Sequence, residues 1–259
     1  MHVCYNVNDS YIEPLLVSIL SIVKLTRKKV TFHIISYGGI TYDDFNQLSN
    51  RYNADFIIYD ANKEMLSMKS SGRFPPVTYG RLFISKLISE KKVIYMDVDT
   101  VIVDDLHKLW DLDVSVISVV YEKNSKIARK QKEKLNLDHY FNSGVMLINV
   151  NEAKRYFEDA ILLAKKNNYE YLDQDALNVA FKGVSFPLEE KYNYMNVNRT
   201  KVTPIVIHFA HLKPWKKFCL HSMKHEYTDL KKEIEYRHKM TEKSSIKELL
   251  KNFYLKAFQ

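Results

Sequence analysis

The sequence predicts an α/β fold with a central, mostly parallel sheet, and two observations lead to that prediction. Short apolar runs at residues 3–7, 30–35 and 56–59 are typical of buried strands. Between these runs, apolar residues at helical spacing follow Ser10, and Thr41 marks the start of a second helix. Because strand and helix alternate, we expect right-handed crossovers and parallel strands in this half of the chain.

The second half continues the alternation, beginning with a helix at 79–88 that leads into an apolar strand at 93–96. The lysine-rich stretch 124–136 has almost no large apolar residue, so we interpret it as a surface excursion. A later change to charged helical segments predicts a main domain over residues 1–215 and a basic helical C-terminal extension over 216–259. Further strands are expected at 114–120, 145–150 and 205–207, a short turn or helix at 106–110, and helices at 173–181 and at 151–164, the latter capped by Asn151.

Composition bounds the class of protein. With 259 residues, 46% of them hydrophobic, the chain can form one large domain or one domain with a small appendage. No apolar run reaches the roughly 18 residues of a membrane-spanning helix, and the first ten residues lack the pattern of a secretion signal. Cys4 and Cys219 lie too far apart in sequence for a metal motif or a disulfide framework, which favours a reducing, cytoplasmic location.

The charge and the glycines restrict how an anionic ligand could be held. A net charge of +8 permits binding to nucleic acid, to an anionic membrane or to phosphorylated substrates. The six glycines form neither a Gly-x-Gly-x-x-Gly pattern nor a Walker loop. If the chain binds nucleotide phosphates, a metal ion and basic side chains must therefore hold them.

Two carboxylates, Asp97 and Asp99, follow the strand at 93–96, and ligands bind beyond the carboxyl ends of strands in open α/β sheets. On an extended chain these side chains point the same way, and they repel each other unless a cation lies between them. Oxygen ligands suit Mg²⁺ or Mn²⁺, which commonly also hold substrate phosphates. The pair therefore predicts a metal site, with a solvated acidic turn as the alternative.

Five further groups of polar residues stand beside predicted strands and helices. Alternatives exist for several of them: a buried core histidine, a helix cap, a turn residue, or an arginine that only pairs with a carboxylate. Their value lies in their order along the chain. The groups are Asn8 to Tyr11 after the first strand, Arg81 before the Asp97 strand, Asn142 and Ser143 before a later strand, Asp173 and Gln174 at a helix start, and His208, His211 and Lys213 after the last strand.

Over about residues 2–216, the order and spacing of these motifs resemble glycosyltransferase family 8, the retaining sugar transferases of GT-A fold that include bacterial lipopolysaccharide galactosyl- and glucosyltransferases. The resemblance implies a Rossmann-like nucleotide-binding half. It also implies transfer of a hexose, galactose or glucose, from a UDP-sugar to a hydroxyl of a glycan, glycolipid or glycoprotein acceptor, in the synthesis of a cell-surface or glycoprotein glycan.

The resemblance also implies roles for individual residues. Asp97, Asp99 and His208 would bind Mn²⁺, with Mg²⁺ as the alternative ion, and Lys213 would contact the diphosphate. His211 stands where the family often has a glycine. The donor-binding positions implied are Asn8, Asp9, Ser10, Tyr11, Arg81, Asp97, Val98, Asp99, Asn142, Ser143, Asp173, Gln174, His208, His211 and Lys213.

Retention of configuration allows two mechanisms, a double displacement or an attack on the same face through an oxocarbenium-like state. Gln174 matches the family position nearest the reacting face of the sugar, but an amide is a poor nucleophile. Asp173 is a better nucleophile that the sugar hydroxyls could engage, so both remain catalytic candidates. Arg73 and Tyr171 are the candidates for acceptor contacts.

Other classes of function fit parts of the sequence. Asp97 after an apolar strand is also typical of haloacid dehalogenase-like phosphatases, where the first aspartate is the nucleophile. A non-catalytic sugar-nucleotide-binding module is the third reading. The basic extension predicts a peripheral association with an anionic membrane, with a pair of solvated helices as the alternative, and we expect no nucleic-acid partner.

Overall fold

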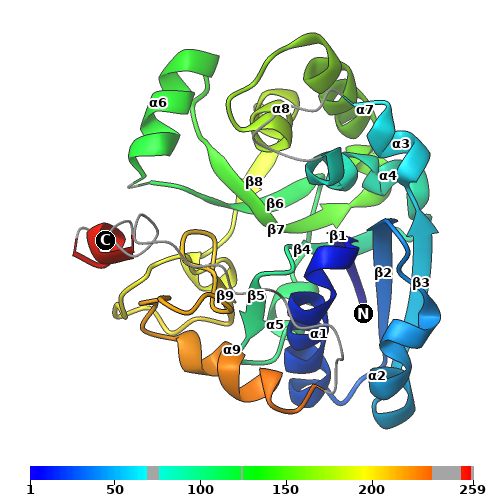
Figure 1. Cartoon of the computed structure of the whole chain (residues 1–259). Helices are drawn as coiled ribbons and strands as arrows, with labels where there is room; N and C mark the ends of the chain where they lie inside the picture. Colours follow the sequence, from blue (N-terminus) through cyan, green and yellow to red (C-terminus); the bar gives the residue numbers. More distant parts are fainter. Residues whose placement is uncertain (69–75, 124, 235–251, 258–259) are drawn as a thin grey trace.

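A computed structural model describes residues 1–68, 76–123, 125–234 and 252–257 (Figure 1). Its first half follows the predicted alternation of strand and helix, with short 3₁₀ turns, labelled η, at several helix starts. The elements of this half are β1 (His2–Asn8), η1 (Asp9–Tyr11), α1 (Ile12–Leu25), β2 (Val30–Tyr37), η2 (Tyr42–Phe45), α2 (Asn46–Arg51), β3 (Ala54–Asp60) and α3 (Asn62–Leu66).

The second half interleaves short helices with strands of both directions. The elements described there are η3 (Pro76–Phe83), α4 (Ile84–Leu87), β4 (Lys92–Met96), β5 (Thr100–Ile102), α5 (His107–Trp110), β6 (Ile117–Tyr121), α6 (Lys126–Leu135), β7 (Phe141–Asn149), α7 (Val150–Lys166), α8 (Leu172–Ala180), β8 (Ser185–Pro187), η4 (Glu190–Tyr192), β9 (Val206–His208) and α9 (Lys224–Lys231).

Seven strands form the central sheet in the order β3-β2-β1-β4-β7-β6-β8. The strands β3, β2, β1 and β4 are parallel, whereas β7 runs antiparallel to both of its neighbours. The carboxyl end of β4 therefore meets the amino-terminal part of β7, and the amide of Asp97 donates to the carbonyl oxygen of Gly144 at 2.8 Å. The predicted, mostly parallel α/β fold is confirmed, and the reversed strand brings a second group of polar residues to the same edge.

Helices cover both faces of this sheet (Figure 1). Leu15 of α1 packs with Tyr5 of β1 on one face, and Phe157 of α7 packs with Tyr95 of β4 on the other. Burial of each such side chain contributes roughly 1.5–3 kcal/mol relative to exposure. A separate two-stranded sheet pairs β5 with β9, and this pairing sets Thr100 opposite His208.

Several predicted elements differ in detail. The stretch 124–136 contains the helix α6, because Ser125 caps it by accepting from the amide of Ala128, and its many lysines are good helix formers. The predicted helix at 79–88 is a 3₁₀ stretch followed by one α-helical turn. The helix α7 is capped by Asn149, which accepts from the amide of Glu152, so the prediction of Asn151 as the cap was wrong.

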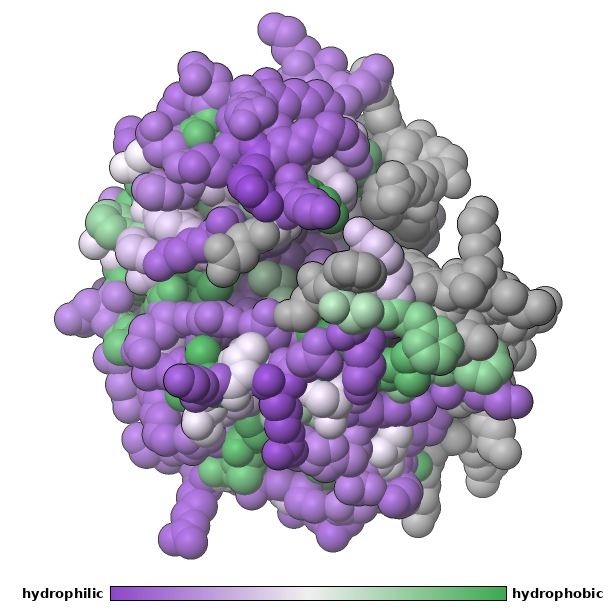
Figure 2. Space-filling view, turned by 90° about the vertical axis from the view of Figure 1, so that its left-hand side faces the viewer, coloured by the Kyte–Doolittle hydropathy of each residue, from purple (hydrophilic) through white to green (hydrophobic). Residues whose placement is uncertain are grey.

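The predicted C-terminal extension lies partly outside the described residues, because the structure describes 216–234 and 252–257 of it. Within these parts, Tyr227 of α9 packs against the main domain, and Asn252 donates to the carbonyl oxygen of Phe218 at 2.6 Å. Among the described helices, none has the length and apolarity needed to cross a membrane. Figure 2 shows a largely hydrophilic face on which apolar residues form separate patches and a hollow divides the upper and lower parts.

Candidate active site

Asp97, Asp99 and His208 converge at the edge of the sheet. Asp97 follows β4, Asp99 precedes β5, and His208 ends β9 opposite the start of β5. One ligand atom from each of the three residues lies within 4.8 Å of the others, and His208 Nε2 is 3.4 Å from Asp99 Oδ1 and 3.8 Å from Asp97 Oδ2. Two carboxylates and one imidazole are a fitting donor set for Mn²⁺ or a similar divalent ion.

Gly144 on β7 makes room for the histidine of this cluster. A Cβ atom added at Gly144 would lie 2.2 Å from His208 Cε1, far inside van der Waals contact. Only a glycine therefore allows the imidazole to approach the strand so closely.

The tautomer of His208 follows from its neighbours. The Gly144 amide can only donate, and it bonds Asn142 Oδ1 at 2.9 Å. Asn193 Nδ2 donates to the same oxygen at 3.0 Å, which leaves Asn193 Oδ1 to face His208 Nδ1 at 2.8 Å. The proton of the imidazole must therefore be on Nδ1, and the lone pair of Nε2 points toward the carboxylates, as a metal ligand requires.

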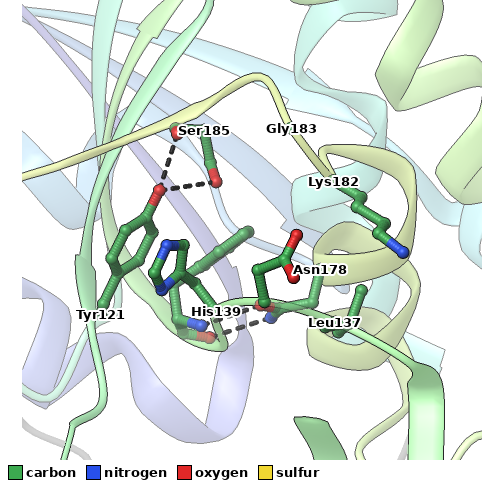
Figure 3. Close-up of a pocket in the computed structure, with 9 residues that line it drawn as sticks. Tyr121, Leu137, His139, Asn178, Lys182, Gly183 and Ser185 are labelled. Atoms are coloured by element: carbon green, nitrogen blue, oxygen red, sulfur yellow. Dashed lines mark hydrogen bonds between the residues drawn. The ribbon is translucent and has the colours of Figure 1, made fainter.

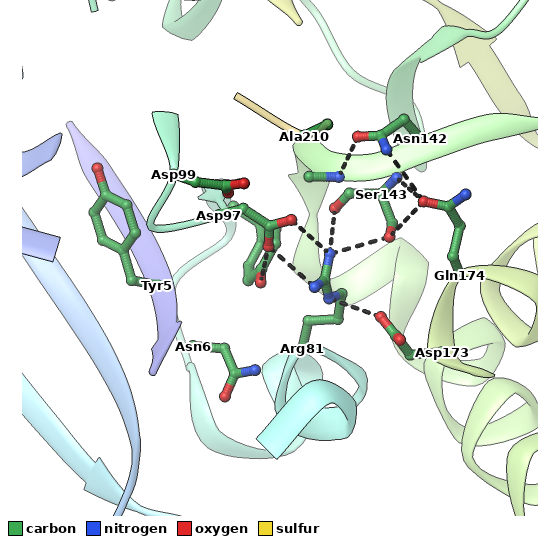
Figure 4. Close-up of polar contacts among 12 residues, drawn as sticks. Tyr5, Asn6, Arg81, Asp97, Asp99, Asn142, Ser143, Asp173, Gln174 and Ala210 are labelled. Atoms are coloured by element: carbon green, nitrogen blue, oxygen red, sulfur yellow. Dashed lines mark hydrogen bonds and ion pairs between the residues drawn. The ribbon is translucent and has the colours of Figure 1, made fainter. Parts of the chain in front are cut away.

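Arg81 of η3 joins three parts of the site (Figure 4). Its guanidinium makes ion pairs with Asp97 at 3.0 Å and with Asp173 at 2.9 Å, and it donates to the backbone oxygen of Ser143 at 3.0 Å. Tyr95 completes the arrangement, because its hydroxyl donates to Asp97 at 2.7 Å and its ring lies under the guanidinium. The arginine therefore pairs with two carboxylates in a buried place and offsets one of their two negative charges.

Asp173 and Gln174, at the start of α8, face this arginine and the beginning of β7. Burial raises the pKa of Asp173 to about 6, although the positive charge of Arg81 opposes the change. The Gln174 side chain accepts from Asn142 Nδ2 and from the Ser143 amide, both at 3.2 Å. A pocket of about 130 Å³ opens between η3 and α8; its lining includes Arg81, Asp97, Asp173, Gln174 and Tyr171.

Lys213 contacts the other metal-cluster carboxylate, and its ammonium group donates to Asp99. Burial of Asp99 favours the neutral acid, but the positive charge of Lys213, joined by that of His208 whenever its ring is protonated, outweighs it and holds the pKa of that carboxyl well below its usual range. The carboxylate is therefore ionised and ready to bind a cation at any pH near neutrality.

The predicted nucleotide residues lie at the carboxyl end of β1. Asp9 has a structural role, because its carboxylate accepts from the amide of Gly39 at 2.8 Å and so joins η1 to the turn after β2. Asn8 Oδ1 is buried without a hydrogen-bond partner among the described residues, so a ligand could donate to it. Tyr11 is 39% exposed, and its ring lies 6.0 Å from that of Trp215.

Of the remaining predicted site residues, one lines the small pocket, one lies at another cleft and one lies outside the described residues. His211 borders a larger cleft of about 440 Å³ whose lining also includes Glu122 and Asn193. Tyr171 lines the small pocket, and Arg73 lies outside the described residues. Asn193 and Glu122 were not among the residues that the sequence suggested, because nothing local distinguishes them from other polar residues near a strand.

A separate cavity of about 380 Å³ lies at the far end of α8 (Figure 3). There the Asn178 amide bonds both the amide nitrogen and the carbonyl oxygen of Phe141, at 2.8 and 2.9 Å. This pair of bonds holds the start of β7 against α8, and so keeps Asn142 and Ser143 beside Gln174.

Comparison with known proteins agrees with this geometry. The family model for glycosyl transferase family 8 matches residues 2–219. A Haemophilus influenzae protein described as a glycosyltransferase is 30% identical over 91% of this chain and 79% of its own, and a lipopolysaccharide 1,2-glucosyltransferase of Escherichia coli is 26% identical over 85% and 74%. The galactosyltransferase LgtC, crystallised with donor and acceptor sugar analogues, shares the fold with a TM-score of 0.77 and 24% identity, over 92% of this chain and 98% of that one.

The central sheet with its reversed strand is therefore the GT-A fold, and its carboxyl edge carries an Asp-Asp-His cluster. Because the match covers residues 2–219 of the chain, the chain belongs to glycosyl transferase family 8.

Proposed function

We propose that this enzyme transfers a hexose, glucose or galactose, from a UDP-sugar to a hydroxyl of a glycan acceptor with retention of configuration. The observation that carries the proposal is the position of the Asp97–Asp99–His208 cluster directly beside the pocket that contains Arg81 and Gln174. A diphosphate on the cluster would bring its sugar into that pocket. The lipopolysaccharide glucosyltransferase among the relatives supports a cell-surface glycan as the product, with a glycoprotein glycan as the alternative.

The ion proposed for the cluster is Mn²⁺, with Mg²⁺ as the alternative. When bound, it supplies Lewis-acid stabilisation of the charge that develops on the departing UDP. Lys213, already beside Asp99, adds a positive charge on the same side. The buried oxygen of Asn8 and the exposed ring of Tyr11 are suited to hydrogen bonding and stacking with uracil, and Asp9 supports them by holding the turn at Gly39.

Within the pocket, we assign different roles to the two catalytic candidates. The Asp173 carboxylate is held by Arg81 at 2.9 Å and is therefore better placed to bind sugar hydroxyls than to attack carbon. The Gln174 oxygen is a neutral, negatively polarised group that can face the reacting carbon and stabilise positive charge there. This assignment favours same-face attack through an oxocarbenium-like state.

The cleft of about 440 Å³ is our proposed acceptor site. It shares Asn193 with the network around His208, so it opens next to the metal cluster. Burial raises the pKa of Glu122, while its bond with Ser125 opposes the change; this carboxyl and the ring of His211 offer hydrogen-bond partners to a sugar hydroxyl. Tyr171, which lines the small pocket, and Arg73 remain candidates for acceptor contacts.

The basic extension is proposed to add a membrane contact to a catalytic domain of residues 1–215. Its cations and aromatic residues are typical of segments that lie on anionic membranes, which would place the enzyme at the inner face of the cell membrane. Co-sedimentation with anionic vesicles, with and without residues 217–259, tests this. Equal binding by both forms would remove the proposal.

The central experiment is a screen of UDP-sugars for hydrolysis without an acceptor, in Mn²⁺ and in excess EDTA. We expect UDP-glucose or UDP-galactose to be hydrolysed slowly, with loss of activity in EDTA. Release of phosphate from phosphomonoesters would instead support the phosphatase alternative. Binding of a UDP-sugar without hydrolysis or transfer would support the alternative of a non-catalytic sugar-nucleotide-binding module.

A further inference from the structure

The amide of Gln174 is held at both ends. Its oxygen accepts from Asn142 Nδ2 and from the Ser143 amide at 3.2 Å each, and from the Ser143 hydroxyl at 3.5 Å (Figure 4). Its nitrogen donates to the hydroxyl oxygen of Tyr140 at 3.1 Å. Tyr140 in turn donates to Asp175 Oδ1 at 2.5 Å, and Asp175 Oδ2 accepts from the amide of Tyr171 at 2.9 Å.

The direction of this chain of hydrogen bonds is determined by groups that can act only as donors or only as acceptors. A backbone amide can only donate, so the Gln174 atom that faces the Ser143 amide must be the oxygen. Burial raises the pKa of Asp175, while the bonds that its carboxylate accepts from Tyr140 and from the Tyr171 amide oppose the change. In this ionised form Asp175 can only accept, so the Tyr140 hydroxyl donates to Asp175 and accepts from Gln174. Both ends therefore demand the same orientation of the amide, with the oxygen toward Asn142 and Ser143, and Ser143 also lines the small pocket beside Arg81.

We propose that Tyr140 and Asp175 are positioning residues that keep the negative end of the Gln174 dipole turned toward the reacting carbon of the donor sugar. This inference rests on the role that we propose for Gln174. An amide held the other way would present N–H groups to a carbon that is becoming positive. Tyr140 is 1% exposed, so water cannot easily replace its hydroxyl.

The isosteric change Asp175→Asn tests the direction of the chain. The amide of Tyr171 requires an acceptor, so the new side chain must turn its oxygen there and its nitrogen toward Tyr140. Tyr140 must then accept from residue 175 and turn its own proton toward Gln174. This favours the reversed amide, against the demand of the Ser143 amide, so the orientation of Gln174 is no longer fixed. We expect kcat for hydrolysis of UDP-glucose or UDP-galactose to fall more than tenfold, with the donor KM changed less than about twofold.

The change Tyr140→Phe releases the amide without reversing it. We expect kcat to fall by about tenfold, less than in Asp175→Asn. Tyr59→Phe is the matched control, because it removes a hydroxyl that bonds His33 on the distant part of the sheet, and kcat should stay unchanged. Thermal unfolding of each variant separates a loss of fold from a loss of orientation.

The same two changes in a Gln174→Ala background decide between positioning and plain support of the structure. If they act through the amide, they have no further effect on kcat once it is removed. An equal fall in both backgrounds overturns the proposal, as does a normal kcat in Asp175→Asn. A normal kcat in Gln174→Ala alone would instead contradict the proposed role of Gln174.

The side-chain amide signals of Gln174 in an NMR spectrum give a readout that needs no turnover. The signals are assigned by their absence in Gln174→Ala. We expect slow hydrogen exchange in the native protein and fast exchange in Tyr140→Phe, because the hydroxyl that the N–H bonds is lost. Identical exchange in both proteins would show that Tyr140 does not hold the amide.

Discussion

The proposed nucleotide side of the site, formed by Asn8 to Tyr11, differs in construction from the proposed sugar side, formed by Arg81, Asn142, Asp173, Gln174 and Asn193. The nucleotide side comes from one βα connection, and the amide of Gly39, in the turn after β2, donates to its Asp9. The sugar side draws residues from η3, β7, α8 and the segment after η4, and a continuous network joins them to His208. We expect substitutions on the nucleotide side to have separate effects. A substitution on the sugar side is expected to affect the whole hydrogen-bond network.

The largest effect is expected at the cluster that both sides share. Asp99→Asn removes one charge from the metal site and leaves Lys213 without its counterion. Transfer in Mn²⁺ should fall about a thousandfold or more, which corresponds to a loss of several kcal/mol of charge stabilisation. Initial rates at saturating donor measure it. Asp104→Asn, at a surface ion pair, is the control, and near-normal activity of Asp99→Asn in excess EDTA would contradict the metal assignment.

The next effect belongs to the sugar side alone. Gln174→Ala removes the oxygen proposed to face the reacting carbon, so kcat should fall by about 10²–10³, as when one preorganised polar group is removed from an active site. The donor KM should change little. Steady-state kinetics with UDP release separate the two quantities, and an effect confined to KM would reduce Gln174 to a binding residue.

A smaller effect tests whether the sugar side and the metal cluster are coupled. Asn193→Ala removes the acceptor of the His208 Nδ1–H group. The affinity for Mn²⁺ should weaken by about 10–100-fold, the usual loss when a hydrogen-bond partner of a metal-binding histidine is removed. Asn193→Asp keeps an acceptor for that proton and should lose less. Calorimetric titration with Mn²⁺ measures both, with Asn196→Ala as control. Unchanged affinity in Asn193→Ala would mean that the histidine orientation does not depend on this residue.

The smallest effect concerns the contribution of His33, in β2, to the stability of the protein. Burial lowers the pKa of His33 to about 4, so between its ordinary value of 6.5 and that value the unfolded chain binds a proton that the folded protein does not. Stability from this group is complete above pH 6.5 and is lost as the pH falls toward 4.

Denaturant unfolding at pH 7 and pH 5 measures this loss. His33→Gln should lose about 1 kcal/mol less than the native protein between the two values, after allowance for solvent screening. An equal loss in both proteins would show that other groups govern the acid limb of stability.

The sequence allowed most of the first half to be predicted, because β1, β2, β3, α1 and α2 are each signalled by their own residues, whereas the short helix α3 was not predicted. The same holds for Asp97, Asp99 and His208, which stand beside apolar strands. Tyr140, Asn193 and Glu122 gave no such signal, since their importance comes from partners that only tertiary structure brings near.

The helix α6 was missed for a related reason. Ala128 and Gln131 are buried, but they are too few and too polar to produce a visible apolar face in the sequence. The capping bond of Ser125 and the helix-forming lysines determine this element, and they leave little trace in a hydrophobicity pattern.

The antiparallel pairing of β6 with β7 has a consequence for how such enzymes could diversify. Tyr121 and Phe141 are paired across these strands, so the whole segment 122–140 departs from and returns to adjacent points of one ladder. Doubling the length of such a closed excursion costs only about 0.6 kcal/mol in chain entropy. The segment borders the larger cleft through Glu122, Lys123 and Ser125. Insertions there could thus remodel what the cleft admits while the sheet, the metal cluster and the amide network stay in register.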